Sequence, residues 1–175
     1  MSELKISCAI CNKPKTVLDC AICESRICKS CAEFITPTTF KYIDFLPAKM
    51  EHTNAFCTQC YATDVLPAIE AYENVVADAK NIRVFEKTQT KETRLIKRLE
   101  DPIVVEHCID IQEATMKMAY IATKKGFNSI VDTDIRTVKI RNGTYQTSEC
   151  SGTCIPVNVS DDKIIKDRSI ARDPN

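Results

Sequence analysis

The sequence predicts an α+β protein in which a small cysteine-rich module precedes a domain with an antiparallel sheet and one main packed helix. Three observations predict it. Eight of the 11 cysteines fall in four C-x-x-C pairs near the start of the chain. An apolar stripe at helical spacing follows Asp110. The pair Asn142-Gly143 separates two runs rich in Ile, Val, Thr and Tyr, which is typical of a β-hairpin.

Composition and charge exclude several classes of protein. The chain has 175 residues, with 24 Lys plus Arg against 24 Asp plus Glu, so no net field attracts nucleic acid. Its apolar runs are too short to insert in a membrane, and its first residues, MSELKIS, lack the pattern of a secretory signal. We therefore expect a cytoplasmic protein. No catalytic residues are predicted, because the chain lacks a phosphate-binding glycine loop and a nucleophile elbow and has only two histidines.

The clustered cysteines favour metal binding. Chance would give roughly 0.6 C-x-x-C pairs for this cysteine content, against the four observed. A C-x-x-C turn directs two thiolates at one tetrahedral ion, and two such turns complete a closed zinc site. Disulfides would need an oxidising compartment, and an iron–sulfur or redox role is the third alternative. Zinc is the favoured interpretation.

The spacing of the pairs favours an interleaved arrangement with two zinc ions per chain. Only four residues separate Cys23 from Cys28, so the second and third pairs are too close in sequence to share a relaxed site. The predicted ligands are Cys8, Cys11, Cys28 and Cys31 for site 1, and Cys20, Cys23, Cys57 and Cys60 for site 2. His52 lies near the fourth pair, but eight cysteines already fill two sites, so we expect it not to be a ligand.

This order resembles the cross-brace of FYVE-type and RING-type zinc fingers over residues 8–60. The segment CAICESRICKSC, from Cys20 to Cys31, matches the FYVE inner spacing. The resemblance implies a treble-clef fold, but the residues that carry the chemistry of these families are missing. The stretch TVLDCAIC, from Thr16 to Cys23, has no Arg or His for a phosphoinositide, and no His stands among the paired positions, as it does in RING ligases.

The sequence divides into four parts. Residues 1–61 form the finger, which has few large apolar side chains, so zinc ligation is expected to supply part of its folding free energy. Residues 62–80 are expected to form a connecting helix, capped by Asp64 and with Pro67 in its first turn. The α+β domain covers residues 81–158, and the charged tail, 159–175, is expected to be flexible or to dock on a neighbouring subunit.

Within the second domain, strands are predicted at residues 82–85 and 103–105. Asp110-Ile111-Gln112-Glu113 resembles a capping box, and Lys124-Lys125-Gly126 ends the helix that it begins.

A two-residue turn at Asn142-Gly143 would pair Arg141 with Thr144 and place Cys150 opposite Ile135. Cys150 and Cys154 would then share a face about 13 Å apart, too far for a disulfide or a shared ion. We expect both, and Cys108, to be small buried residues rather than ligands.

Two segments of this domain resemble YbjQ-type proteins, a family named for heavy-metal binding. They are GFNSIVDTDI, from Gly126 to Ile135, and SGTCIPV, from Ser151 to Val157. The resemblance implies a ring-like homo-oligomer, with a pentamer favoured, and no enzymatic activity. The chain departs from the pattern because it lacks the glycine-rich stretch before the helix, and no cysteine, histidine and carboxylate cluster at ligand spacing occurs in this half.

The sequence therefore predicts a non-enzymatic oligomeric adaptor that presents zinc fingers to a partner, whose identity the sequence does not specify. One alternative is a nucleic-acid-binding zinc protein that uses the basic stretch from Lys87 to Arg98, although acidic residues dilute this stretch. The other alternative is a RING-like ubiquitin-transfer factor.

Overall fold

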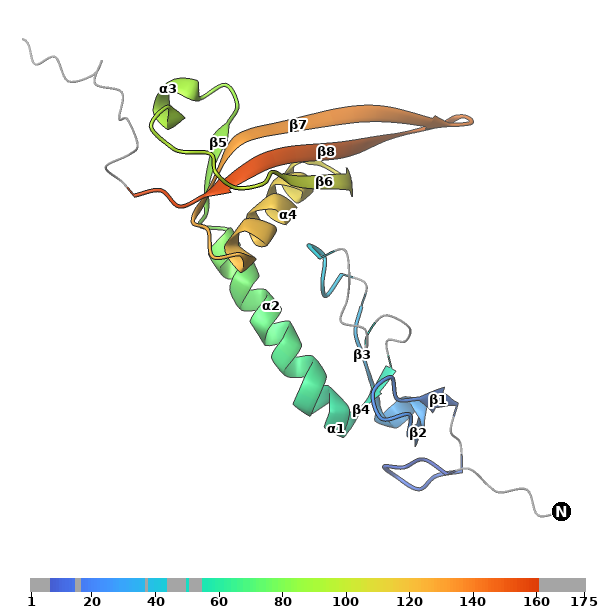
Figure 1. Ribbon diagram of the computed structural model, residues 1–175. Coiled ribbons are helices and arrows are strands. Elements are labelled where there is room, and N and C mark those ends of the chain that lie inside the picture. Colours follow the sequence, from blue (N-terminus) through green and yellow to red (C-terminus); the bar gives the residue numbers. More distant parts are fainter. Residues whose placement is uncertain (1–6, 15–16, 37, 44–49, 51–54, 161–175) are drawn as a thin grey trace, which may run out of the picture. The chain divides into compact units, whose positions relative to one another are not determined.

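The protein consists of two compact units, Met1–Asn74 and Val75–Asn175. The computed structural model describes residues 7–14, 17–36, 38–43, 50 and 55–160 (Figure 1). His52 and the tail beyond Ser160 lie outside the described residues. Within the part that is described, no helix is both long and apolar enough to cross a membrane. The fold class is α+β, as predicted.

Unit 1 contains two very short antiparallel sheets. Strand β1 (Leu18–Asp19) pairs with β2 (Arg26–Ile27), and β3 (Ala32–Phe34) pairs with β4 (Ala55–Cys57). Ile27 and Phe56 are the fully buried residues of these strands, and each stands immediately before a cysteine. Strands of two or three residues form too few ladder hydrogen bonds to be stable alone. Unit 1 therefore needs stabilisation from another source.

The helix that follows the last cysteine pair begins earlier than residue 62. Helix α1 (Thr58–Cys60) continues through a π-helical turn (Tyr61–Val65) into α2 (Leu66–Ala79). Cys57, rather than Asp64, is the N-cap, and its Sγ accepts a hydrogen bond from the backbone N–H of Cys60. The wider π turn ends at Val65, two residues before Pro67, whose nitrogen carries no hydrogen to donate to the regular hydrogen-bond ladder. The cysteine turn is thus itself the first helical turn.

Aromatic residues of the connection after β3 pack within unit 1. The rings of Phe40 and Tyr72 meet edge to face with their centroids 5.2 Å apart. The backbone N–H of Tyr42 donates a 3.1 Å hydrogen bond to the Tyr72 hydroxyl. These contacts make Phe40 and Tyr72 part of the core of unit 1, whereas Phe34 is half exposed.

Unit 2 is built on a four-stranded sheet in the order β5-β7-β8-β6. Its strands are β5 (Arg83–Glu86), β6 (Ile103–Cys108), β7 (Ser129–Asn142) and β8 (Tyr145–Val157). β5 runs parallel to β7, whereas the β7–β8 and β8–β6 pairs are antiparallel. The predicted antiparallel sheet is thus present in β7, β8 and β6, and β5 adds to its edge in parallel, after a crossover through β6 and the helix that follows it.

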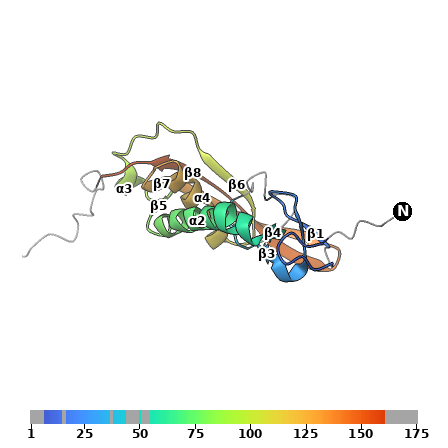
Figure 2. The same ribbon diagram turned by 90° about the horizontal axis from the view of Figure 1, so that it is seen from below.

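Helix α4 (Ile111–Lys124) covers one face of this sheet (Figures 1 and 2). The predicted capping residues act as such: Asp110 Oδ1 accepts from the N–H of Glu113, and Glu113 Oε2 accepts from the N–H of Ile109, both at 2.7 Å. Gly126, with φ of +85°, follows the last turn. The main core between helix and sheet comprises Ile103, Val105, Cys108, Ala114, Met118, Ala122, Ile130, Cys150 and Cys154.

A glycine in β8 allows this helix to pack closely. A Cβ atom at Gly152 would lie 3.0 Å from Cε of Met118 and 3.3 Å from Cγ1 of Ile135. Such separations are tighter than ordinary van der Waals contact, so any side chain here would displace the buried Met118. Gly152 thus determines how near α4 can lie to the strand.

The predicted hairpin is present, but its predicted register is wrong. Asn142 pairs with Tyr145, so Gly143 and Thr144 form the turn, and Gly143 adopts a φ of +64°. Arg141 accordingly lies opposite Gln146 rather than Thr144. The glycine occupies the first turn position, where positive φ is required, so the turn moves by one residue along the chain.

The three cysteines of unit 2 are buried as expected. Cys108, Cys150 and Cys154 are at most 2% exposed and belong to the main core. The corrected register places Cys150 opposite Thr137 on β7 and opposite Cys108 on β6. Neither metal-binding group in the described residues includes any of them.

The segment between β5 and β6 is fastened to β7 by an ion pair. It contains helix α3 (Thr90–Thr93), and its Arg98 donates from Nε and Nη2 to the carboxylate of Asp132 at 2.5 and 2.9 Å. Arg98 Nη1 also donates to the carbonyls of Thr93 and Ile96. Asp132 has a φ of +53° at a bulge in β7. The basic stretch is thus partly neutralised by its own fold.

We predict that Asp132→Asn destabilises unit 2 by about 1 kcal/mol, because Arg98, whose side chain is 29% exposed, loses its charged acceptor. The hydrogen bond from Arg98 holds the pKa of Asp132 below its ordinary value of 3.8. The stabilisation is therefore complete above that value and is lost as pH falls through the lower pKa of the folded state. Hydrogen exchange of unit 2 peptides measures the effect. Asp101→Asn, at an exposed position, is the control, and equal exchange in both variants would contradict the prediction.

Candidate metal centres

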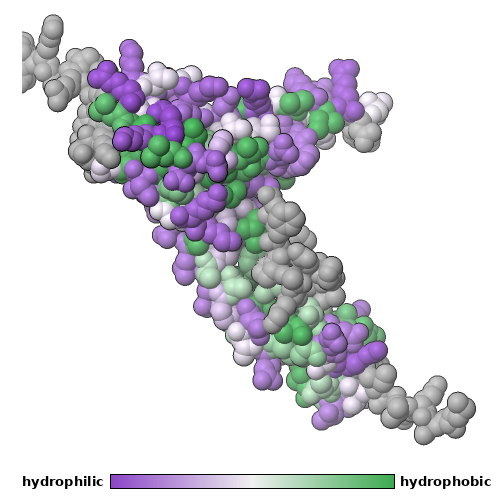
Figure 3. Space-filling model, in the orientation of Figure 1, coloured by the Kyte–Doolittle hydropathy of each residue, from purple (hydrophilic) through white to green (hydrophobic). Residues whose placement is uncertain are grey.

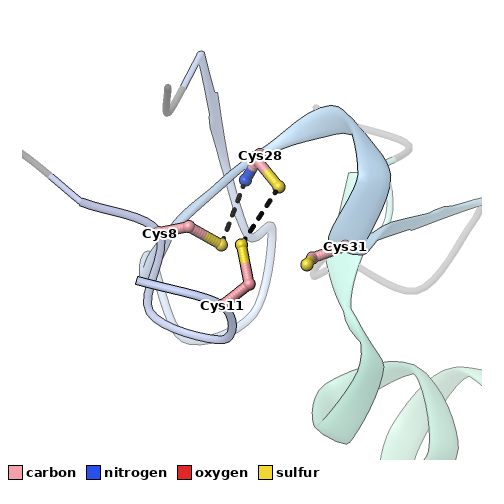
Figure 4. A group of neighbouring side chains, drawn as sticks. All are labelled: Cys8, Cys11, Cys28 and Cys31. Carbon is pink, nitrogen blue, oxygen red and sulfur yellow. Dashed lines mark hydrogen bonds between the residues drawn. The ribbon is translucent and has the colours of Figure 1, made fainter. Parts of the chain in front are cut away.

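Two groups of four cysteines meet in unit 1, with the membership that the spacing predicted. In each group the four sulfur atoms lie within 4.8 Å of one another. Figure 4 shows the sulfurs of site 1 turned toward a common centre. Site 1 comprises Cys8, Cys11, Cys28 and Cys31, and site 2 comprises Cys20, Cys23, Cys57 and Cys60.

The first half of each site is the same type of backbone turn. Cys8 and Cys20 each begin a tetrapeptide Cys-Ala-Ile-Cys, and each is followed four residues later by a residue with positive φ: 58° at Asn12 and 59° at Glu24. The N–H groups of these two residues donate back to the carbonyls of Cys8 and Cys20, both at 2.9 Å. The repeated C-A-I-C tetrapeptide is a sequence signal of this similarity.

The second half of each site is the start of a helical turn. Cys28 precedes the 3-10 turn Lys29–Cys31, and Cys57 precedes α1. A backbone hydrogen bond also joins the two halves of each site. The N–H of Ala9 donates to the carbonyl of Arg26 in site 1, and the N–H of Ala21 donates to the carbonyl of Ala55 in site 2. Each site is thus one tight turn hydrogen-bonded to the strand that leads into one helical turn.

Backbone N–H groups donate to the sulfurs in equivalent positions of the two sites. The N–H of Cys28 donates to Cys8 Sγ at 3.4 Å, and the N–H of Cys57 donates to Cys20 Sγ at 3.3 Å. Such bonds favour the thiolate, the form that binds a metal. Sequence reasoning identified the cysteines but missed these donors, because backbone groups leave no residue signature.

The electrostatics of each group oppose the ionisation of all four cysteines at once. Backbone hydrogen bonds, that of Cys11 foremost, lower the pKa of Cys8 to about 6, whereas the bond with Cys28 raises the pKa of Cys31 to about 12. In site 2, the bond with Ser25 lowers the pKa of Cys23 to about 6, while burial raises the pKa of Cys60. Without a metal, one thiolate opposes ionisation of the next. A bound cation removes this repulsion.

The separations between sulfurs fit one tetrahedral metal ion per site. A Zn–S bond of about 2.3 Å gives a tetrahedron with an edge of about 3.8 Å. Cys11 Sγ and Cys28 Sγ are 3.7 Å apart, and the equivalent pair in site 2, Cys23 Sγ and Cys57 Sγ, is 3.8 Å apart. Each tetrad can therefore hold a metal ion, and four cysteines leave no open position for water or substrate.

No protein-family model matches the chain, and comparisons with curated proteins and with solved structures find no similar protein. The interleaved tetrads are compatible with a cross-brace finger. The resemblances to FYVE-type, RING-type and YbjQ-type proteins stay predictions from the motifs that carry them.

We predict that a strong chelator unfolds unit 1 and leaves unit 2 folded. Two tetrathiolate sites contribute roughly 10 kcal/mol or more each to folding of a module with such short strands. Hydrogen exchange resolved by peptide should show loss of protection across residues 17–36 and 55–60, with residues 103–157 unchanged.

The variants Cys8→Ser and Cys150→Ala test the assignment of site 1. Both cysteines are buried, but only Cys8 belongs to a tetrad. Mass spectrometry under native conditions should find one metal ion in the first variant and two in the second. Equal metal content in the two variants would contradict the assignment of site 1.

Proposed function

We propose that the protein is a non-enzymatic zinc-binding scaffold, which assembles into a homo-oligomer and presents its finger to a protein partner. The single observation that carries the proposal is the pair of complete tetrads. Four thiolates at tetrahedral separation are the ligand set of structural zinc sites, whereas catalytic zinc keeps an open position. Because these thiolates must remain reduced, we propose an intracellular location.

The far end of the β7–β8 hairpin supports self-association. Pairing with β6 ends at Cys150 and pairing with β5 ends at Thr133, so the rest of the hairpin has no neighbouring strand among the described residues. Figure 1 shows it extending beyond β6 as a two-stranded ribbon. Both of its edges present backbone N–H and C=O groups to which another chain can add.

The sheet face opposite α4 gives further support. Residues Ile96, Val131, Val157 and Val159 form a second core cluster at one end of this face. Toward the ribbon, Val104, Val138 and Ile140 lie on the same face and are 40–58% exposed. Apolar residues also come to the surface among hydrophilic ones along this end of unit 2 (Figure 3). An oligomer that covers these side chains would bury apolar area and repeat the finger around the assembly, which raises avidity.

The two alternatives receive less support. For nucleic acid, both ends of the basic stretch form ion pairs within the protein. Arg98 contacts Asp132, and Lys87 Nζ lies 3.6 Å from Asp134. For ubiquitin transfer, a charging assay with conjugating enzymes is the direct test. For an enzyme, the described residues offer a single histidine, His107, which is exposed at the surface and pairs with Glu149.

Native mass spectrometry of protein purified without chelator tests the proposal, because one spectrum reports metal and assembly together. We expect two zinc ions per chain in a closed oligomer, with a pentamer favoured by the YbjQ resemblance. Zinc-bound monomers would overturn the scaffold. Metal-free chains, each lighter by the two hydrogens lost per disulfide, would overturn the metal sites.

The double variant Val138→Glu, Ile140→Glu should convert the oligomer to monomers, because it places charge on the exposed apolar face. Lys139→Glu is the matched control, since Lys139 lies between them in sequence and its side chain lies on the opposite face of the ribbon. Light scattering coupled to size-exclusion chromatography gives the mass. An intact oligomer in the double variant would show that this face is not the interface.

A further inference from the structure

The two metal sites share a plan but differ in exposure. Cys11 and Cys23 occupy equivalent places, each closing a Cys-Ala-Ile-Cys turn. Cys11 is partly covered, whereas Cys23 is exposed, and it is the one exposed cysteine in the described part of the chain. Because the two turns have the same sequence and similar backbone conformations, the difference in exposure arises from the residues packed around them.

A cavity opens onto site 2 over most of its ligands. Its volume is about 820 Å³, and its lining includes Cys23, Cys57 and Cys60. The cavity beside site 1, of about 530 Å³, is lined by only one ligand, Cys28, together with Lys13, Val17 and Lys29. Three ligand residues of site 2 therefore border a cavity, whereas only one ligand residue of site 1 does.

The exposed sulfur of Cys23 is also close enough to a second sulfur of this cavity to react with it. Cys23 Sγ lies 3.8 Å from Cys57 Sγ, and both residues line the cavity. Ser25, whose Oγ is 3.3 Å from Cys23 Sγ, lines it as well and offers a hydroxyl next to the exposed sulfur. The site thus combines an accessible sulfur, a second sulfur beside it and space for a reagent.

We propose that site 2 is a thiol-modification site, at which a small hydroperoxide oxidises Cys23 and Cys57 to a disulfide and so releases the metal, while site 1 keeps its own. This inference rests on the proposed binding of zinc at both sites. Susceptibility to oxidation follows thiolate character and exposure, and exposure is where the two sites differ.

Hydrogen peroxide oxidises the two thiolates to a disulfide in two steps. The Cys23 thiolate attacks one peroxide oxygen, the O–O bond breaks, and hydroxide leaves and takes up a proton to become water; Cys23 is then a sulfenic acid. The Cys57 thiolate attacks the Cys23 sulfur, the S–O bond breaks, and hydroxide again leaves as water. The two sulfurs lose two electrons, which the peroxide gains. Cys20 and Cys60 alone are too few ligands for a closed tetrahedral site.

The first test follows the zinc-loaded full-length protein during treatment with hydrogen peroxide. A chromogenic chelator records zinc release, and peptide mapping identifies the disulfide at the point where one equivalent has left. We expect the first equivalent to leave about tenfold or more faster than the second, with Cys23 in the disulfide formed. Release of both ions at one rate, or a first disulfide that lacks Cys23, would overturn the inference.

Two matched variants test the assignment to a particular sulfur. Histidine retains zinc ligation but cannot form a disulfide, so Cys23→His should abolish the fast phase. Cys11→His makes the same change at the equivalent place in site 1 and should leave the fast phase unchanged. Identical kinetics in the two variants would overturn the inference.

If a variant does not bind two zinc ions before oxidation, the protein without substitutions is measured in its place. Limiting alkylation with iodoacetamide should label Cys23 before any other tetrad cysteine, and preferential labelling of a site 1 cysteine would overturn the inference. Failure of the proposed zinc binding, on which the inference rests, is distinguishable throughout, because it appears before any oxidant is added, as protein purified with fewer than two zinc ions per chain.

Discussion

The fold of unit 1 depends on bringing four mutually repelling sulfurs to one point, twice. Its strands are two or three residues long, so the ladders cannot fix the chain by themselves. The tight turns and helical turns that carry the cysteines orient the thiolates, and the fully buried Ile27 and Phe56 fill the space behind them. A cation bound in each tetrad would remove this charge repulsion and would contribute more to folding than the burial of so small a core.

Unit 2 is stabilised mainly by the packing of apolar side chains. Its stability comes from α4 packed on a sheet, with Gly152 setting how closely they approach and with a second cluster on the other face. Polar groups act at defined points: the capping residues Asp110 and Glu113 begin the helix, and Arg98 holds a connection against the bulge at Asp132. None of the described residues of this unit belongs to a candidate metal group, which is why the two units should respond differently to a chelator.

The features that were predictable from sequence are those encoded locally. The two tetrads follow from cysteine spacing, because a C-x-x-C turn fixes its two sulfurs over four residues. Helix α4 follows from its cap and apolar stripe. The parallel pairing of β5 with β7 depends on segments 46 residues apart at Arg83 and Ser129, and no local pattern reports it. The predicted hairpin register was wrong because a glycine can occupy either of the two turn positions. The exposure of Cys23 was not predictable, because it depends on packing that the repeated C-A-I-C tetrapeptide does not encode.

The interleaving of the tetrads has a consequence for biosynthesis. A chain made from its N-terminus holds all four ligands of site 1 once Cys31 has been added, when site 2 still has only Cys20 and Cys23. Domains generally form as the chain emerges, N-terminal parts first. Site 1 can thus load its metal on a nascent chain and hold the Cys20 turn near its place until Cys57 and Cys60 arrive. The order of translation thus sets the order in which the two ligand sets become complete, and the set that is completed last is also the one with an exposed cysteine.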